Sequence, residues 1–241
     1  MKVLVIGDAC RDVYIYGSTA RKNPEAASPL LNNLMTATRD GMAANVANNL
    51  TALGAEVHTI LPAEPWSAKE RYIDERYGTQ LLRVDYDRPS DPLGELPDLS
   101  AYDAVVVSDY DKGFVSHDIL QKLDGKIPLF VDTKKRELGY LSDAWVKVNE
   151  REHELILTPP KRLIATLGNR GSMYEGRHAA ANPVDVIDPC GAGDTYLAAF
   201  AWAMMQEPDY VFGAMEFANL AAAVTCKHRG TYAPTLEEIH R

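Results

Sequence analysis

The chain has 241 residues, of which 46% are hydrophobic and 24% charged, and its formal net charge is −9. This length fits one α/β domain, and the acidic balance argues against nucleic acid or a membrane surface as a partner. Cys10, Cys190 and Cys226 form no Cys-x-x-Cys pair, which argues against a zinc site and fits a reducing, cytoplasmic location. No apolar run approaches the roughly 18 residues of a membrane span, and the run at 3–6 is too short for a signal peptide.

Strand and helix signals alternate along the chain. Short apolar, β-branched runs predict buried strands at 3–7, 103–110, 127–133 and 162–168. Apolar residues at helical spacing predict helices at 43–55, 115–124, 194–206 and 209–226. This alternation predicts a mainly parallel sheet with helices on its faces. Ligands bind at the carboxyl ends of such strands, where the sequence has Asp8, Asp109, Asp132 and Gly168.

Two segments do not follow the strand–helix alternation. Residues 11–31 and 70–87 alternate apolar and polar side chains and contain turn residues. This pattern predicts antiparallel strands outside the main sheet, which together form a small lid. The sequence therefore predicts a single domain over residues 1–241 that carries a lid.

Several common functional motifs are absent from the sequence. The first strand is not followed by G-x-G-x-x-G, and there is neither a P-loop nor a G-x-S-x-G nucleophile motif. The six histidines show no metal-ligand spacing. A dinucleotide site, a P-loop nucleotide site and a histidine-based metal centre are therefore not expected.

Residues 188–200 read DPCGAGDTYLAAF and place three small residues before an acid and an apolar helix. Backbone N–H groups are unpaired at a helix N-terminus, and small side chains allow an anion to approach them. In the simplest interpretation Asp194 is only a helix cap. In the other, the donors bind the transferred phosphoryl group while Asp194 accepts a hydroxyl proton.

The string DPCGAGDT resembles the D-[TV]-x-G-A-G-D-[TS] signature of the ribokinase-like, or PfkB, carbohydrate kinases. Further strings are similar to motifs of that family, at 40–55, 149–152, 166–171 and 217–224. Others resemble the bacterial heptose 7-phosphate kinases, at 7–26, 80–87, 106–113 and 131–135. The resemblance implies a three-layer α/β/α domain with a mostly parallel central sheet and a small β-strand lid. It also implies an ATP-dependent, Mg²⁺-requiring kinase for a sugar or sugar phosphate.

The resemblance also assigns roles to matching residues. It implies that Asp194 is the catalytic base and that Gly191, Ala192 and Gly193 form the anion hole for the γ-phosphate. The positions that match sugar-binding residues are Asp8, Asp12, Gly41 and Asn45. Those that match the nucleotide and phosphate side are Lys134, Asn149, Glu152, Thr166, Gly168, Gly171 and Asn219. Glu152 would place Mg²⁺ indirectly, and Asp188 matches an acid beside a monovalent-cation site in some members, with K⁺ as the candidate ion.

Some of these residues also have simpler structural interpretations. Asn149 is a candidate helix cap, Asp8 a buried hydrogen-bond hub and Lys134 a solvated lysine. Cys190, beside the expected phosphate site, is interpreted as a packing residue rather than a nucleophile.

The chain also departs from the family pattern. The usual second glycine of a Gly-Gly pair is Met42, which predicts a stiffer lid hinge. Two segments that the family normally carries are nearly absent, between 60–66 and 71–77 and between 151–157 and 161–167. A shortened kinase with exposed sheet is therefore expected, and self-association is the expected cover.

Three functions remain open from the sequence. The first is a kinase for a sugar or sugar phosphate, with heptose 7-phosphate as a candidate acceptor, and Asp194, Asn149 and Glu152 favour it. The second is a weakly active or inactive binding or regulatory protein of the same fold, which Met42 and the missing segments favour. The third is a same-fold kinase for a nucleoside or other small alcohol, against which residues 21–26 argue.

The lid segments carry two further expectations. Their unpaired strand edges predict a homodimer. They also hold basic residues that would bind a phosphate on the acceptor, with Arg21 as a substrate-binding residue. These basic residues are Arg11, Arg21, Lys22, Lys69, Arg71, Arg76 and Arg83.

Overall fold

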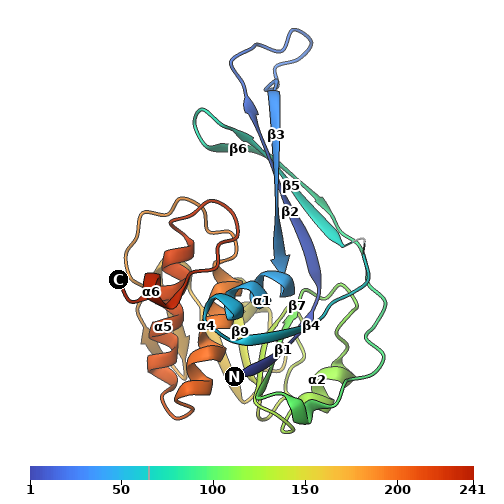
Figure 1. Ribbon diagram of the computed structural model, residues 1–241, viewed down its shortest axis with the longest axis vertical. Helices are drawn as coiled ribbons and strands as arrows, with labels where there is room; N and C mark the ends of the chain where they lie inside the picture. The colour runs from blue at the N-terminus through green and yellow to red at the C-terminus, as the bar shows by residue number, and fades with distance from the viewer. Residues whose placement is uncertain (65) are drawn as a thin grey trace.

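A computed structural model describes residues 1–64 and 66–241, and its centre is an eight-stranded sheet (Figure 1). The strand order is β12-β11-β10-β9-β8-β7-β1-β4, in which the six strands from β10 to β4 are parallel. The last two strands, β11 and β12, are antiparallel. The strands are β1 (Lys2–Gly7), β4 (Glu56–Ile60), β7 (Ala104–Asp109), β8 (Leu129–Thr133), β9 (Trp145–Asn149), β10 (Arg162–Thr166), β11 (Ser172–Tyr174) and β12 (Arg177–Ala179). The predicted three-layer α/β architecture is confirmed.

Helices cover the two faces of this sheet unequally (Figure 1). One face packs against α1 (Ala43–Ala52), α4 (Ala192–Gln206) and α5 (Val211–Thr225), and α6 (Leu236–Ile239) packs against α5. The other face packs against α2 (His117–Leu123). A further short helix, α3 (Glu150–Leu155), follows β9 directly. Burial of both apolar faces of the sheet is the main contribution to stability.

Irregular segments of the chain complete the cover of the second face. Leu138 and Leu141 are fully buried there, and Leu93, Leu96 and Leu99 pack against the same cluster. The expectation that the missing segments leave the sheet exposed is therefore wrong for β1, β7, β8 and β9 on this face, whereas β4, which precedes the first missing segment, keeps exposed residues. Apolar residues in loops cover these strands in place of helices, and these residues show no periodic spacing from which their position could be predicted.

A second, four-stranded sheet forms the lid, with the order β3-β2-β5-β6. Its strands are β2 (Ala9–Ser18), β3 (Asn32–Met42), β5 (Ser67–Asp74) and β6 (Thr79–Tyr86). It rises from the main sheet, and the loop 19–31 lies at its far end (Figure 1). The lid extends beyond the predicted segments because residues 32–42 also form a strand. Its two central strands, β2 and β5, are parallel rather than antiparallel.

The strand order brings distant parts of the sequence to one edge of the main sheet. Since β1, β7, β8 and β9 are parallel neighbours, their carboxyl ends lie side by side. Asp8 and Tyr110 directly follow β1 and β7, Asp132 lies near the end of β8, and Asn149 ends β9. This edge lies below the lid and is where a ligand is expected.

Candidate active site

The turn before α4 presents Asp194 in the first turn of that helix. Gly191 is the N-cap and has φ 80°, the left-handed region that favours glycine. A Cβ atom on Gly191 would lie 2.9 Å from Asn45 Nδ2, so a side chain there would displace Asn45. The expectation of three free donors is wrong for Ala192, because its N–H donates to the Pro189 carbonyl oxygen at 3.2 Å.

Asp194 is held by a hydrogen bond to each carboxylate oxygen. Asn45 Nδ2 donates to Oδ2 at 2.9 Å, and the Tyr110 hydroxyl donates to Oδ1 at 3.2 Å. Burial raises the pKa of Asp194 to about 6; the hydrogen bond from Asn45 opposes the rise, while the nearby Asp132 carboxylate adds to it. A carboxylate with this pKa is mostly ionised at neutral pH yet can accept a proton readily.

A buried ion pair lies beside Asp194 and was missed by the sequence interpretation. Lys147 Nζ and Asp132 Oδ2 are 2.6 Å apart, and both side chains are almost fully buried. Lys147 Nζ is also 3.1 Å from the place where a Cβ on Gly193 would stand, so its charge lies against the anion-hole turn. The available signal was a lysine inside the apolar run that precedes Asn149.

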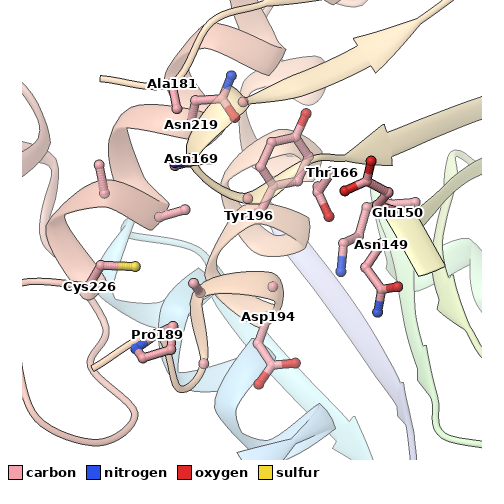
Figure 2. A pocket seen from close by; sticks show the side chains of 18 of the residues that line it. Asn149, Glu150, Thr166, Asn169, Ala181, Pro189, Asp194, Tyr196, Asn219 and Cys226 are labelled. Atoms are coloured by element: carbon pink, nitrogen blue, oxygen red, sulfur yellow. The ribbon is translucent and has the colours of Figure 1, made fainter. Parts of the chain in front are cut away.

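One cavity of about 1070 Å³ connects this turn with the carboxyl ends of β8, β9 and β10. Figure 2 shows Asp194 at one end, Asn219 and Ala181 at the other, and Thr166 and Asn149 along one side. The cavity brings together the predicted base, the predicted anion-hole residues and most of the residues predicted for the nucleotide and phosphate side. These are Lys134, Asn149, Thr166, Gly168, Gly171, Gly191, Ala192, Gly193, Asp194 and Asn219.

The N-x-x-E motif forms a capping box at the start of α3. Asn149 Oδ1 accepts from the Glu152 N–H, and Glu152 Oε2 accepts from the Asn149 N–H, both at 2.9 Å. Glu152 does not line the cavity, but its other oxygen is paired with Lys134, which does. The simple cap interpretation of Asn149 therefore describes a real contact, and the cap also fixes Lys134 at the cavity wall.

The T-x-G-x-x-G turn requires glycine at its last position. Gly171 has φ 92°, and a Cβ there would collide with the carbonyl oxygen of Ala179. Asn219 Nδ2 donates to that same carbonyl oxygen at 3.0 Å. Gly171 and Asn219 thus position the loop after β12, which forms the far wall of the cavity.

Asp8 and Asp12 lie where the lid meets the main sheet, a region called the acceptor side because the sequence predicts that the acceptor binds there. Asp8 Oδ2 accepts the N–H groups of Tyr110 at 2.8 Å and Lys112 at 3.3 Å. Asp8 Oδ1 is buried and accepts no hydrogen bond from the described residues. Burial raises the pKa of Asp8, and the two backbone N–H groups fix its carboxylate at the end of β1. Gly41 packs directly against Asp12, where a Cβ would collide with its carboxylate.

The lid places two cations at the acceptor side. Arg71 is buried, forms an ion pair with Asp12 and lies 5.2 Å above the Tyr14 ring. Lys69 Nζ lies 5.4 Å from the centre of the Tyr110 ring. The structure does not bring Arg21 to this group, because Arg21 is exposed in the loop 19–31 at the far end of the lid (Figure 1).

Two residues beside the anion hole serve the packing of this region. Cys190 Sγ lies 3.4 Å from both the Tyr14 hydroxyl and Arg71 Nη2, and burial raises the pKa of its thiol to about 11. Such a thiol is a poor nucleophile. The two Asp188 oxygens accept the N–H groups of Cys190 and Gly230, each at 2.9 Å. Asp188 therefore joins the anion-hole turn to the loop after α5.

Met42 stands at the junction of the lid with α1. It ends β3, is the N-cap of α1, and has φ 57° and ψ −135° with a buried side chain. This backbone conformation favours glycine and costs about 1–3 kcal/mol for another residue. The departure from Gly-Gly therefore places backbone strain at the base of the lid.

The comparisons with known proteins agree with this geometry. Residues 142–239 match the pfkB family carbohydrate kinase. The predicted resemblance to pfkB carbohydrate kinases is confirmed. The Bifunctional protein HldE of Bradyrhizobium sp. (strain ORS 278) is 28% identical over 309 residues, which cover 99% of this chain and 62% of that protein. This chain thus spans less than two thirds of the length of this relative. The alignment is also longer than the 241 residues of this chain, in line with the predicted shortened form.

Solved structures show the same fold at low sequence identity. Ribokinase from Thermotoga maritima superimposes with a TM-score of 0.72 at 16% identity, covering 100% of this chain and 98% of that one. Phosphofructokinase-2 from Escherichia coli, in complex with potassium, also gives a TM-score of 0.72 at 16% identity, covering 99% and 97%. The ribokinase-like fold is confirmed, and with the family match it supports the predicted class of enzyme, an ATP-dependent kinase.

Two findings on the described residues, 1–64 and 66–241, concern metal sites and membrane spans. They include no group of three or more His, Cys, Asp or Glu side chains placed to hold a metal ion by themselves. No helix among them has the length and apolar character needed to span a membrane.

Proposed function

We propose that this chain transfers the γ-phosphoryl group of ATP to a hydroxyl group of a sugar phosphate. The observation that carries the proposal is the buried Asp194 carboxylate beside the anion-hole turn, at the point where the cavity meets the acceptor side. The ribokinase-like fold and the pfkB match support the reaction class. The resemblance to heptose 7-phosphate kinases and the cations of the lid support the acceptor class.

Asp194 is the proposed base for the acceptor hydroxyl. As the hydroxyl oxygen forms its bond to the γ-phosphorus, the bond from that phosphorus to the β–γ bridging oxygen breaks and ADP leaves. The hydroxyl proton passes to a carboxylate oxygen of Asp194. Asn45 and Tyr110 hold that carboxylate in place, which reduces the rearrangement needed for the transfer.

Positive charge and N–H groups surround the proposed phosphoryl site. The Lys147 ammonium lies against Gly193, and Lys134 lines the same cavity. The start of α4 adds the partial positive charge of a helix N-terminus. These groups are suited to stabilise the charge on the equatorial oxygens of the transferred group.

The residues present are also suited to Mg²⁺ bound to the nucleotide. Asp132 Oδ1 is buried at the cavity wall and accepts no hydrogen bond from the described residues, and carboxylate oxygen is a ligand that Mg²⁺ favours. Asp132 is the proposed residue on this side, and Glu152 would act only indirectly, because its two oxygens bind the Asn149 N–H and Lys134. Mg²⁺ would neutralise phosphate charge there.

Activity should require Mg²⁺, because the charge on ATP must be neutralised before a hydroxyl can attack. We expect turnover to disappear in excess chelator and to return when Mg²⁺ is added. Asp188 carries the additional expectation that K⁺ stimulates the enzyme more than Na⁺. A coupled assay for ADP release checks both, and full activity in the chelator would contradict the first. Equal rates in K⁺ and Na⁺ would contradict the expected stimulation by K⁺.

Lid cations are the proposed recognition element for a phosphate on the acceptor. Arg71 is already paired with Asp12, whereas Lys69 has no ion-pair partner within residues 1–64 and 66–241. Lys69 is therefore the better placed of the two to meet an anionic acceptor group. Arg21 remains a prediction, which requires the loop 19–31 to approach the acceptor.

We expect kcat/KM to be roughly 30- to 150-fold higher for heptose 7-phosphate than for the free sugar, the effect of one desolvated charge-assisted contact. Lys69→Ala should remove much of this ratio while sparing the KM for ATP. Arg21→Ala, measured beside it, shows whether the lid tip contributes. Equal efficiency with the two acceptors would end the sugar-phosphate proposal.

The lid is also the proposed dimer interface. β3 and β6 are the free edges of its sheet, and several exposed apolar side chains gather on it. These are Leu34, Met35, Tyr77, Leu82 and Tyr86. Light scattering at micromolar concentration should give about twice the 26.6 kDa of one chain. A mass close to a single chain would rule the dimer out.

The proposed reaction is tested by an ADP-release screen with sugars, sugar phosphates and nucleosides side by side. Release above background with a sugar phosphate, absent in Asp194→Asn, supports the proposal. ADP release with nucleosides alone would mean that the acceptor is a nucleoside and not a sugar phosphate. No release with any acceptor would favour a binding or regulatory role.

A further inference from the structure

Tyr110 stands where the proposed base, the lid and the acceptor-binding carboxylate meet. It follows β7 directly. Its hydroxyl donates to Asp194 Oδ1 at 3.2 Å, and its backbone N–H donates to Asp8 Oδ2 at 2.8 Å. One residue thus contacts the proposed base and the proposed acceptor-binding carboxylate.

The ring of Tyr110 also contacts a cation from the lid and one from the body. Lys69 Nζ, on β5 of the lid, is 5.4 Å from the ring centre, and Lys134 Nζ, after β8, is 4.8 Å from it. Both distances lie within the range of a cation–π interaction. The lid is therefore in contact with the residue that touches Asp194.

We propose that Tyr110 is a positioning residue that orients Asp194 through its hydroxyl and seats lid residue Lys69 on its ring. The proposal rests on the proposed function, because it takes Asp194 as the base. The two roles use different parts of one side chain. Phenylalanine at this position keeps the ring and removes the hydroxyl, whereas leucine removes both.

Other groups around Asp194 also influence its titration and must be held constant in the comparison. The Tyr110 hydrogen bond favours the ionised carboxylate, so its loss should raise the pKa of Asp194. The surrounding groups include a neutral amide, a carboxylate, two lysines and a thiol. They are Asn45 from α1, Asp132 from β8, Lys134 after β8, Lys147 from β9 and Cys10 from β2.

The first role is tested by NMR titration of the aspartate carboxyl carbons in the full chain, with the Asp194 signal assigned by its loss in Asp194→Asn. In Tyr110→Phe we expect the midpoint for Asp194 to move up by about one pH unit. The acid limb of the kcat profile should move with it. Tyr140→Phe is the matched control, because the Tyr140 hydroxyl is buried with no hydrogen-bond partner in the described residues. It should leave both midpoints unchanged.

The second role is tested with Lys69→Met in the Tyr110→Phe and Tyr110→Leu backgrounds, with heptose 7-phosphate and ATP. We expect the effect of Lys69→Met on the acceptor KM to be about two- to fivefold smaller in the leucine background, the size of one cation–π contact. Equal effects in both backgrounds would overturn the seating of Lys69. Thermal unfolding and the KM for ATP confirm that each variant is folded.

The results also separate this inference from the proposed function. An Asp194 midpoint that is unchanged in Tyr110→Phe overturns the orienting role, while the base assignment stands if Asp194→Asn is inactive. Normal turnover in Asp194→Asn overturns the proposed function instead, and with it the premise that Tyr110 positions a base.

Discussion

Asp194→Asn should lower turnover by about 10²–10⁴, the usual contribution of general acid–base catalysis. Asparagine keeps the size of the side chain, but it cannot accept the hydroxyl proton. The Asp194 carboxylate binds Asn45, a residue predicted to bind the acceptor. The KM for ATP should therefore change little. In the unmodified chain, kcat should fall as the pH drops below about 6, where Asp194 becomes protonated.

The same substitution should stabilise the fold at neutral pH. Burial raises the pKa of Asp194 from 3.8 to about 6, so the folded chain binds a proton more tightly than the unfolded chain. Stability is therefore lost as the pH rises from about 4 to 6, by about 3 kcal/mol for a shift of about two units. Asparagine has no charge to bury, so its advantage should be present above pH 6 and absent below pH 4.

Urea unfolding of both proteins at pH 4 and pH 8 measures this difference, because the other carboxylates are common to the two. Turnover of Asp194→Asn at a near-normal rate would contradict the assignment of Asp194 as the base. Reduced stability of the variant at pH 8 would instead show that the Asp194 carboxylate is favourably paired in the folded chain.

Much of the fold could be predicted because apolar runs and helical spacing report burial directly. The strands β1, β7, β8 and β10 and the helices α1, α2, α4 and α5 lie where these patterns predicted them. The strand β9 was missed since Lys147 interrupts its apolar run, and β3 was missed because most of its side chains are exposed. Burial of a charge and exposure of a strand both remove the pattern on which such predictions depend.

The candidate site could be predicted where a motif fixes a backbone shape. Gly171 and Gly191 fit this case, since both require positive φ at a close approach. The roles of Tyr110 and Lys147 could not be predicted from the sequence. Tyr110 contacts Asp194, which lies 84 residues away in the sequence, and Lys147 pairs with Asp132 on the adjacent strand. Only the strand order brings these side chains to Asp194.

Lys147→Met should produce the largest loss of stability among these variants. Lys147 and Asp132 form a buried ion pair at 2.6 Å, and removal of the cation leaves a buried carboxylate without a counter-charge. Such a change costs about 3–5 kcal/mol. The double variant Lys147→Met/Asp132→Asn has no buried charge at this place and should recover most of that loss. Lys134→Met is the matched control, since its ion pair with Glu152 is partly exposed and worth at most about 1 kcal/mol.

Turnover should not recover in the double variant, and this separates the two roles of Lys147. Its ammonium lies against Gly193 at the proposed phosphoryl site, where loss of one stabilising group lowers turnover by about 10²–10³. Lys147 also opposes the rise in the pKa of Asp194, so the acid limb of the kcat profile should move to higher pH in Lys147→Met. Urea unfolding together with the pH dependence of kcat measures both effects. A double variant that regains stability and turnover together would mean that Lys147 only balances Asp132, and the phosphoryl site would then depend on Lys134 and the start of α4.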